Sequence, residues 1–206
     1  MTLALIDYGA GNLRSVANAL AAAGAGDVVV TADPQVVAAA DRVVLPGVGA
    51  FGASMAALDR IPGMVDAMRE AALTRARPFL GVCVGMQLLA DAGEELGTHA
   101  GLGWIGGTVR RLQPADAQVR VPHMGWNGVV PRGDAAGLAV PAGEAYFLHS
   151  FHFDAADPAD VRASTEHGGP VVAAVGQGTV LGVQFHPEKS QAYGLAFLRD
   201  FLAWRP

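Results

Sequence analysis

The nine residues Phe79-Leu80-Gly81-Val82-Cys83-Val84-Gly85-Met86-Gln87 carry the strongest structural signal in this 206-residue chain. The apolar run at their start predicts a short buried strand, and the residues from Gly85 onward predict a helix. Cys83 stands between the two, with a glycine two positions to either side. This is the pattern of a nucleophile elbow, a sharp strand-to-helix turn that presents a reactive side chain. Gly81 and Gly85 provide the space that such a turn needs.

Cys83 is predicted to be a nucleophile. The amino terminus of a helix favours the thiolate form of a cysteine, because the helix dipole and the free N–H groups stabilise negative charge there. The alternative is that Cys83 is a small buried hydrophobic residue at the end of a strand. The symmetrical glycines favour the nucleophile.

Strands and helices alternate on both sides of this stretch. Alternation of this kind predicts an α/β fold with a central, mostly parallel sheet flanked by helices. Binding sites in such sheets lie at the carboxyl ends of the strands. The expected buried strands are Leu3–Ile6, Val28–Val30, Val43–Leu45, Phe79–Val82 and Val180–Phe185. The expected helices run from an Asn12 cap to about Ala23, from Ala53 to Leu73 with a break at Ile61-Pro62-Gly63, and from Ser190 to Trp204.

The second half of the chain differs in pattern. From Trp104 to about Val175, short apolar runs are separated by Gly, Pro and Asp, which predicts additional antiparallel strands that extend or flank the main sheet. No linker or repeat divides the chain, so residues 1–206 are expected to form a single domain.

Composition excludes several classes of protein. Hydrophobic residues make up 51% and charged residues 16%, so the chain can bury a large core and is not disordered. A net charge of −5 argues against a nucleic-acid or membrane binder. The start of the chain lacks a basic leader, and no apolar run suits a membrane span, so a cytoplasmic location is expected. One cysteine alone excludes an intramolecular disulfide and a cysteine-based zinc site.

His186 and Glu188 are the candidate base and its orienting group. His186 follows an apolar strand and precedes a proline, which places it at a strand end, and Glu188 is close enough to fix its tautomer. The alternative is a loop histidine beside a solvated glutamate. His149 and His152 invite a metal interpretation, but no further ligand pattern accompanies them.

An oxyanion formed at Cys83 needs fixed N–H donors. The Val84 N–H, directly after the nucleophile, is one candidate. The loop Pro46-Gly47-Val48-Gly49 is a second candidate, because its glycines allow a peptide plane to turn toward the site. Phosphate binding is a weaker interpretation, since the loop lacks the lysine and spacing of a nucleotide-binding loop. A plain tight turn is the simplest alternative.

Three motifs in this order resemble the triad-type glutamine amidotransferases: PGVGAF, GVCVGMQ and QFHPEKS. The segments IDYGAGNLRS, LPGVGAF and PHMGWN are similar to those of one subfamily, the glutaminase subunits of imidazole glycerol phosphate synthase. The resemblance covers essentially the whole chain. It departs in two places, with Val84 after the cysteine instead of leucine and Phe151 where many relatives have tyrosine.

The resemblance implies a role for each matching residue. Cys83 is implied as nucleophile, His186 as general base and acid, and Glu188 as the residue that orients it. Backbone donors to the oxyanion are implied at Val84 and Val48. Contacts with glutamine are implied at Gly47, Gln87, Glu95, Ser150 and Phe151. The chemistry requires no metal and no organic cofactor.

The resemblance also implies a partner. Ammonia released by this chain would pass to a (β/α)-barrel cyclase, which makes imidazole glycerol phosphate and an aminoimidazole carboxamide ribonucleotide in histidine biosynthesis. The residues expected to face this partner are Asn12, Trp126, Tyr146 and Lys189. The alternative places Trp126 and Tyr146 in the core and leaves Lys189 as a solvated charge.

Three competing interpretations stay open at the level of sequence. The chain could be the glutaminase of another pathway, although its opening and its PHMGWN segment argue against that. It could be a cysteine peptidase or hydratase on a related fold, but such enzymes usually place the histidine closer to the cysteine. A non-catalytic regulatory subunit is the third, and the intact Cys83, His186 and Glu188 set argues against it.

Overall fold

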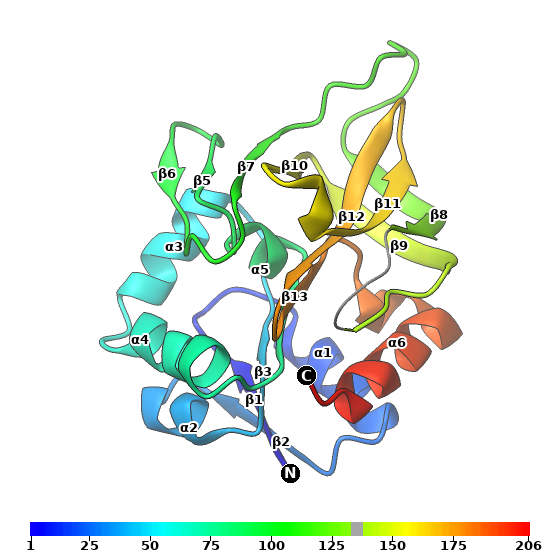
Figure 1. Ribbon diagram of the computed structural model, residues 1–206. Coiled ribbons are helices and arrows are strands. Elements are labelled where there is room, and N and C mark those ends of the chain that lie inside the picture. Colours follow the sequence, from blue (N-terminus) through cyan, green and yellow to red (C-terminus); the bar gives the residue numbers. More distant parts are fainter. Residues whose placement is uncertain (133–137) are drawn as a thin grey trace.

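The computed structural model describes residues 1–132 and 138–206 and is built around a nine-stranded sheet (Figure 1). Five neighbouring strands at one end of the sheet are parallel, and the four that follow are antiparallel. In spatial order the strands are β2 (Asp27–Thr31), β1 (Thr2–Ile6), β3 (Arg42–Leu45), β4 (Phe79–Val82), β13 (Val180–Val183), β12 (Pro170–Gln177), β11 (Val161–Glu166), β8 (His123–Pro131) and β9 (Gly143–His149). The α/β class predicted from the sequence is confirmed, as is the antiparallel extension.

Helices cover both faces of the parallel part of the sheet (Figure 1). On one side lie α1 (Leu13–Ala22) and α6 (Gln191–Ala203), and on the other lie α2 (Pro34–Ala39), α3 (Phe51–Asp59) and α4 (Met64–Arg69). The π-helical turn η1 (Glu70–Thr74) continues α4, and the short α5 (Val84–Gln87) follows β4. The 3₁₀ turns are η2 (Pro158–Asp160) and η3 (Pro187–Lys189). Within the described residues, no helix has both the length and the apolar character needed to cross a bilayer.

A second sheet lies beside the carboxyl end of β4. It has four short strands in the order β10 (Phe151–Ala155), β7 (Gly107–Arg111), β5 (Ala92–Gly93) and β6 (His99–Ala100). Because β10 comes almost directly after β9, the turn at Ser150 joins the two sheets. This turn therefore stands where the sheets meet.

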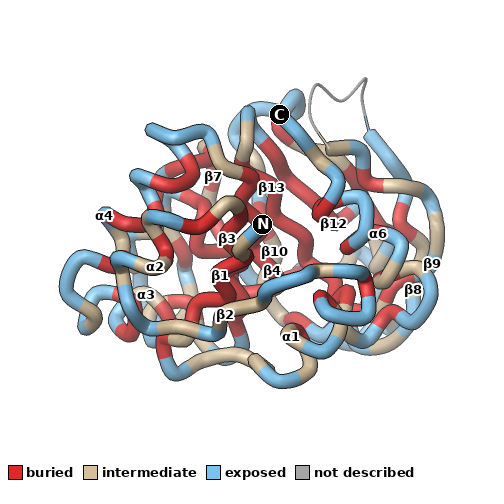
Figure 2. The backbone as a smooth tube through the Cα atoms, turned by 90° about the horizontal axis from the view of Figure 1, so that it is seen from below, coloured by how far each residue is buried: buried red, intermediate tan, exposed pale blue. Residues whose placement is uncertain are grey.

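The core lies between the central strands and the helices (Figure 2). Strands β3, β4 and β13 are buried at every position, as expected for parallel strands covered on both faces. Seven phenylalanines are also fully buried, each contributing about 1.5–3 kcal/mol through removal of apolar surface from water. They are Phe51, Phe79, Phe147, Phe153, Phe185, Phe197 and Phe201.

Two predictions about local structure were wrong. Val28–Val30 forms a strand as predicted, but it is only partly buried, because β2 is the edge of the sheet and one side of it faces water. Asn12 precedes α1 as predicted, yet its side chain makes no capping hydrogen bond. The helix α2 was not predicted. Its start is marked by Asp33, whose Oδ1 accepts a 2.8 Å hydrogen bond from the Gln35 N–H.

Candidate active site

Cys83 occupies the strained position of a nucleophile elbow. Its φ and ψ are 54° and −112°, a conformation that non-glycine residues rarely adopt. Both flanking glycines are required by the close approach of the backbone. A Cβ on Gly81 would lie 2.5 Å from the Gly85 carbonyl oxygen, and a Cβ on Gly85 would collide with the Leu45 carbonyl oxygen. The elbow predicted from the sequence is therefore present in the backbone.

Strand pairing brings Cys83 next to the segment that follows β13. Val82 is opposite Val183 in the parallel ladder, and the Cys83 N–H donates to the Val183 carbonyl over 2.8 Å. Gln184 and His186 therefore leave the sheet at the same level as the cysteine. Cys83 and Gln184 are more than one hundred residues apart in sequence, and the pairing of β4 with β13 brings them together.

His186 and Glu188 form a buried pair beside Cys83. His186 Nδ1 lies 2.8 Å from Glu188 Oε1, and the two side chains are 5% and 3% exposed. Since a carboxylate accepts, Nδ1 carries the proton and Nε2 is left for the cysteine. Burial by itself lowers the pKa of His186, but its interactions with Cys83 and Glu188 outweigh burial and raise the pKa to about 9. A base oriented in this way can exchange a proton with a thiol.

The loop that carries His186 is fastened to the far strand of the sheet. The His186 N–H donates to the Tyr146 carbonyl over 2.9 Å. The buried Ser190 hydroxyl donates to the His186 carbonyl over 2.7 Å and accepts from the Tyr146 N–H over 2.9 Å. Although β9 is the last strand in the sheet order, its residue Tyr146 therefore contacts the loop that carries His186 beside Cys83.

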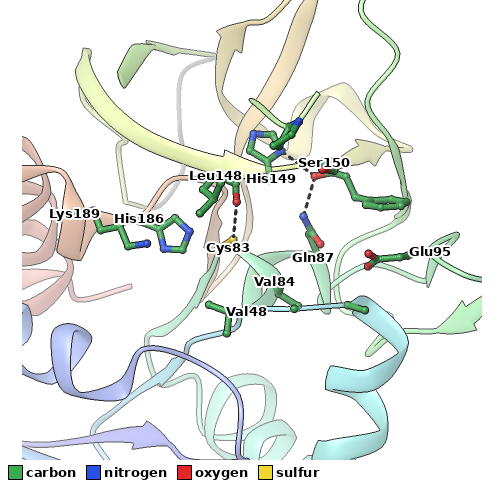
Figure 3. A pocket seen from close by; sticks show the side chains of 14 residues that line it. Val48, Cys83, Val84, Gln87, Glu95, Leu148, His149, Ser150, His186 and Lys189 are labelled. Atoms are coloured by element: carbon green, nitrogen blue, oxygen red, sulfur yellow. Dashed lines mark hydrogen bonds between the residues drawn. The ribbon is translucent and has the colours of Figure 1, made fainter. Parts of the chain in front are cut away.

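A cavity of about 490 Å³ opens above Cys83 (Figure 3). Most of the residues predicted to form the site meet in its lining: Val48, Cys83, Val84, Gln87, Glu95, Ser150, Phe151, His186 and Lys189. Gly47 is not among them. Its Cα packs behind the site, where a Cβ would lie 2.6 Å from the Gly85 nitrogen and 2.9 Å from the Tyr8 hydroxyl. Outside the cavity lining also lie Asn12, Trp126, Tyr146 and Glu188, the last of which reaches the site through His186.

Two of the predicted substrate-binding side chains already have protein partners. Gln87 Nε2 donates to the Phe151 carbonyl at 2.9 Å and to Gln184 Oε1 at 3.0 Å. Glu95 Oε2 accepts a 2.9 Å hydrogen bond from the Phe51 N–H at the start of α3. The first contact immobilises one side of the cavity, and the second holds the end of the Pro46–Gly49 loop.

Sequence reasoning missed two polar residues of the site. The Tyr8 hydroxyl is buried under the Pro46–Gly49 loop and donates to the Pro46 carbonyl over 2.8 Å. Gln184 is completely buried, with Nε2 3.7 Å from Cys83 Sγ. A signal for Gln184 was available, since an amide side chain directly after four buried strand residues needs a polar partner. Tyr8 gave no comparable signal.

A pair of buried histidines was also missed. His123 begins β8 and is opposite His149, the last residue of β9. His123 Nδ1 lies 2.9 Å from His149 Nε2. Burial lowers the pKa of His123 to about 4 and that of His149 to about 3, so both rings are neutral at pH 7.

Comparison with known proteins identifies a common family. The family model for glutamine amidotransferase class-I matches residues 4–204. A protein of Zymomonas mobilis, the imidazole glycerol phosphate synthase subunit HisH, is 61% identical over all of this chain and 97% of its own length. The protein of the same name from Rhodospirillum rubrum is 55% identical, with both chains covered completely.

Solved structures share the fold at low sequence identity. A crystal structure of a glutamine amidotransferase is 20% identical, with a TM-score of 0.72 over 96% of this chain and 98% of that one. The structure of PurLQS from Thermotoga maritima is 18% identical, with a TM-score of 0.67 over 98% of this chain and 97% of the other. At these identities the likeness concerns the fold alone.

Proposed function

The chain belongs to the class-I glutamine amidotransferase family, and on that premise we propose that Cys83, His186 and Glu188 hydrolyse glutamine as the glutaminase subunit of an imidazole glycerol phosphate synthase. The observation that carries the proposal is the buried 2.8 Å contact of His186 with Glu188 beside a cysteine held at φ 54°. The relatives named for that synthase, at 61% and 55% identity, support the choice of pathway. Residues 1–206 act as a single domain.

In the first half of the reaction, the Cys83 thiolate attacks the side-chain amide carbon of glutamine. A carbon–sulfur bond forms, and the carbonyl π electrons move to the oxygen. When the tetrahedral intermediate collapses, the carbon–nitrogen bond breaks and His186 gives its Nε2 proton to the departing ammonia. The product left on the enzyme is a γ-glutamyl thioester. Glu188 holds the imidazolium in place while it carries the charge.

In the second half, water hydrolyses the thioester. His186 takes a proton from water as the hydroxyl oxygen bonds to the carbonyl carbon. The carbon–sulfur bond then breaks, its electron pair returns to Cys83, and glutamate leaves. The raised pKa of His186 suits a group that must accept a proton in this step and donate one in the other.

The oxyanion is stabilised by backbone N–H groups of Val84 and Val48. Val84 is the first residue of α5, where N–H groups have no acceptor within the helix. Val48 lines the cavity on a loop whose next residue, Gly49, has φ 94°. A peptide flip at Val48 aims the second donor, and the state of the acceptor subunit controls that flip.

Glutamine binds along the opposite wall of the cavity. Glu95 uses one carboxylate oxygen to hold Phe51, and its other oxygen meets the glutamine ammonium group. Backbone groups of Ser150 and Phe151 meet the amino acid end of the substrate, and Gln87 fixes that wall. Gly47 contributes through the shape of its loop, since it lies behind the cavity.

The partner is a (β/α)-barrel cyclase that docks at the cavity mouth and receives the ammonia. Strands β8 and β9 present a face with large exposed apolar side chains, in which Trp126 is opposite Tyr146 and Met124 is opposite Leu148. Lys189 Nζ lies 5.7 Å from the centre of the Tyr146 ring. Exposed apolar surface of this kind marks protein interfaces. Asn12, which is exposed between β1 and α1, is proposed to contact the same partner.

The experiment is glutamate release from glutamine by the full chain, alone and with the cognate cyclase and its nucleotide substrate. The expected result is a large increase in the complex and none with Cys83→Ala. Equal rates with and without the cyclase would refute the assignment of the partner and keep the triad. Full activity of Cys83→Ala would refute the triad itself.

A further inference from the structure

Gln184 is a buried amide that contacts the nucleophile. Its Nε2 lies 3.7 Å from Cys83 Sγ, and its Oε1 accepts a 3.0 Å hydrogen bond from Gln87 Nε2. The side chain is 0% exposed. The contact follows from the pairing of Val82 with Val183, after which Cys83 and Gln184 leave two neighbouring strands together. Gln184 donates to the sulfur only if the nitrogen end of this amide, and not the oxygen end, faces it.

The partners of Gln87 decide the orientation. A backbone carbonyl can only accept, so the 2.9 Å contact between Gln87 and the Phe151 carbonyl must come from Nε2 of Gln87. The second N–H of that group points to Gln184, so the Gln184 atom that accepts it must be the oxygen Oε1. The nitrogen of Gln184 therefore faces Cys83, and its N–H is a donor to the sulfur.

The same carbonyl is fixed from the other side by His149. His149 Nδ1 lies 2.9 Å from the Phe151 oxygen, which can only accept, so Nδ1 carries the proton and Nε2 accepts. The donor to Nε2 is His123 Nδ1, at 2.9 Å. His123 Nε2 is then left as an acceptor, and Asn127 Nδ2 donates to it over 3.0 Å.

Backbone groups close the far end of this chain of hydrogen bonds. Asn127 Nδ2 donates to the Glu166 carbonyl over 2.7 Å, and Asn127 Oδ1 accepts from the Gly128 N–H over 2.8 Å. Both contacts demand the same amide orientation that His123 demands. Every donor and acceptor from Asn127 to Gln184 therefore has one assignment, and all of them agree.

We propose that Gln184 is a further catalytic residue, which donates an N–H to the Cys83 thiolate, and that the chain Asn127–His123–His149 positions it. This inference rests on the proposed glutaminase function. The thiol contact from Cys83 to the Leu148 carbonyl, 3.9 Å long, is lost when the sulfur gives up its proton, whereas the Gln184 contact strengthens because a charged acceptor makes a stronger hydrogen bond. In the second half of the reaction, the same N–H donates a hydrogen bond to the sulfur as the sulfur regains its electron pair.

Alkylation of Cys83 tests the contact without requiring turnover. We would measure the rate of reaction with iodoacetamide against pH in the full chain, for the wild type, for Gln184→Met and for Gln184→Leu. Both variants carry an uncharged side chain of similar size, and neither Met nor Leu has a hydrogen-bond donor. Gln177→Met, exposed on β12, is the matched control. The titratable groups around the sulfur are retained in all four proteins: His186, Glu188 and Tyr8 beside it, and Glu95, His149 and Lys189 in the cavity lining.

The midpoint of alkylation is expected to move up by about one pH unit in Gln184→Met, since a hydrogen bond to a charged group alters an equilibrium about tenfold or more. The kcat for glutamate release in the complex falls by about tenfold, and KM changes by less than about threefold. Gln177→Met leaves all three quantities unchanged. Circular dichroism establishes that each variant is folded, and Gln184→Leu provides the test if Gln184→Met fails to fold.

An unchanged midpoint in a folded Gln184 variant would overturn the inference, while glutamate release by the wild type would leave the proposed function intact. Absence of release by the wild-type complex would instead refute the proposed function, and the alkylation midpoints would still decide the contact. The positioning role has its own variant, His123→Phe, which keeps an aromatic ring in the stack with Phe147 and His167. An upward shift of the alkylation midpoint that is smaller than the shift in Gln184→Met supports that role. An unchanged midpoint refutes it.

Discussion

The buried Tyr8 hydroxyl donates a 2.8 Å hydrogen bond to the carbonyl of Pro46, the first residue of the Pro46–Gly49 loop. This contact holds the first residue of the loop, and the Glu95 carboxylate holds Phe51 at its other end. Val48, which is 44% exposed, and Gly49 lie between these two attachments. A short segment free to rotate between fixed ends is suited to a local peptide flip.

Tyr8→Phe is expected to lower both stability and turnover. One buried hydrogen bond is lost, which costs about 1–2 kcal/mol of unfolding free energy. The loop that presents Val48 also loses one attachment, so kcat for glutamate release falls several-fold. Tyr193→Phe is the control, because the Tyr193 hydroxyl makes a 2.9 Å hydrogen bond to the Pro141 carbonyl away from the cavity. Equal effects of the two variants on kcat would contradict the role assigned to Tyr8.

Gly85→Ala is expected to disrupt the elbow. The added Cβ collides with the backbone carbonyl of Leu45, which cannot move without displacing β3. The expected loss of stability exceeds about 3 kcal/mol, measured by urea unfolding. Gly26→Ala adds the same methyl group where no atom lies within 4 Å, and it is expected to be neutral. A fully stable Gly85→Ala would show that the close packing of the elbow is not required.

The contacts of His186 with Cys83 and Glu188 predict a loss of stability at alkaline pH. Because the pKa of His186 is raised from 6.5 to about 9 in the folded state, its contribution is complete below pH 6.5. The contribution is lost as the pH rises through 9, and it amounts to about 3 kcal/mol. Urea unfolding at pH 6, 7.5 and 9.5 measures it. Glu188→Gln should reduce this dependence, since only the Cys83 contact then raises the pKa of His186, and an unaltered dependence in that variant would count against the pair.

His123 and His149 predict the opposite dependence on the acid side. Their folded pKa values, about 4 and about 3, lie below the ordinary 6.5, so the unfolded chain binds more protons in this window. Their contribution to stability is complete above pH 6.5 and is lost as the pH falls toward 4. Unfolding free energies at pH 7, 5.5 and 4.5 should decline less steeply in His123→Phe than in the wild type. Identical slopes would mean that His123 is not buried as a neutral ring.

Trp126→Glu is expected to weaken binding of the cyclase. The side chain is 48% exposed on the apolar face of β8 and β9, and truncation or charging of an interface tryptophan typically costs tenfold or more in affinity. Titration calorimetry of the complex measures the effect. Val30→Glu introduces the same charge at a 45% exposed valine on the opposite edge strand and should not alter affinity. Equal losses in both variants would place the partner elsewhere.

Local patterns in the sequence were sufficient for the elbow and for the parallel strands. The glycines around Cys83 predict a backbone that only such a turn adopts, and apolar runs of four residues predict strands buried on both faces. These signals are local, because they depend on steric limits within a few residues. The edge position of β2 was not predictable, since burial depends on which strands pair and not on the residues of one strand.

The sequence by itself predicted the elbow around Cys83, the short spacing of His186 and Glu188, and the α/β class, because each depends on residues that are neighbours along the chain. Tertiary structure alone decided that β13 pairs with β4, that β9 returns to the His186 loop, and that Gln184 and Tyr8 belong to the site. The tertiary structure also places Gly47 outside the cavity lining. The physical reason is that hydrogen bonds between distant segments follow from strand order and packing, which no local pattern encodes.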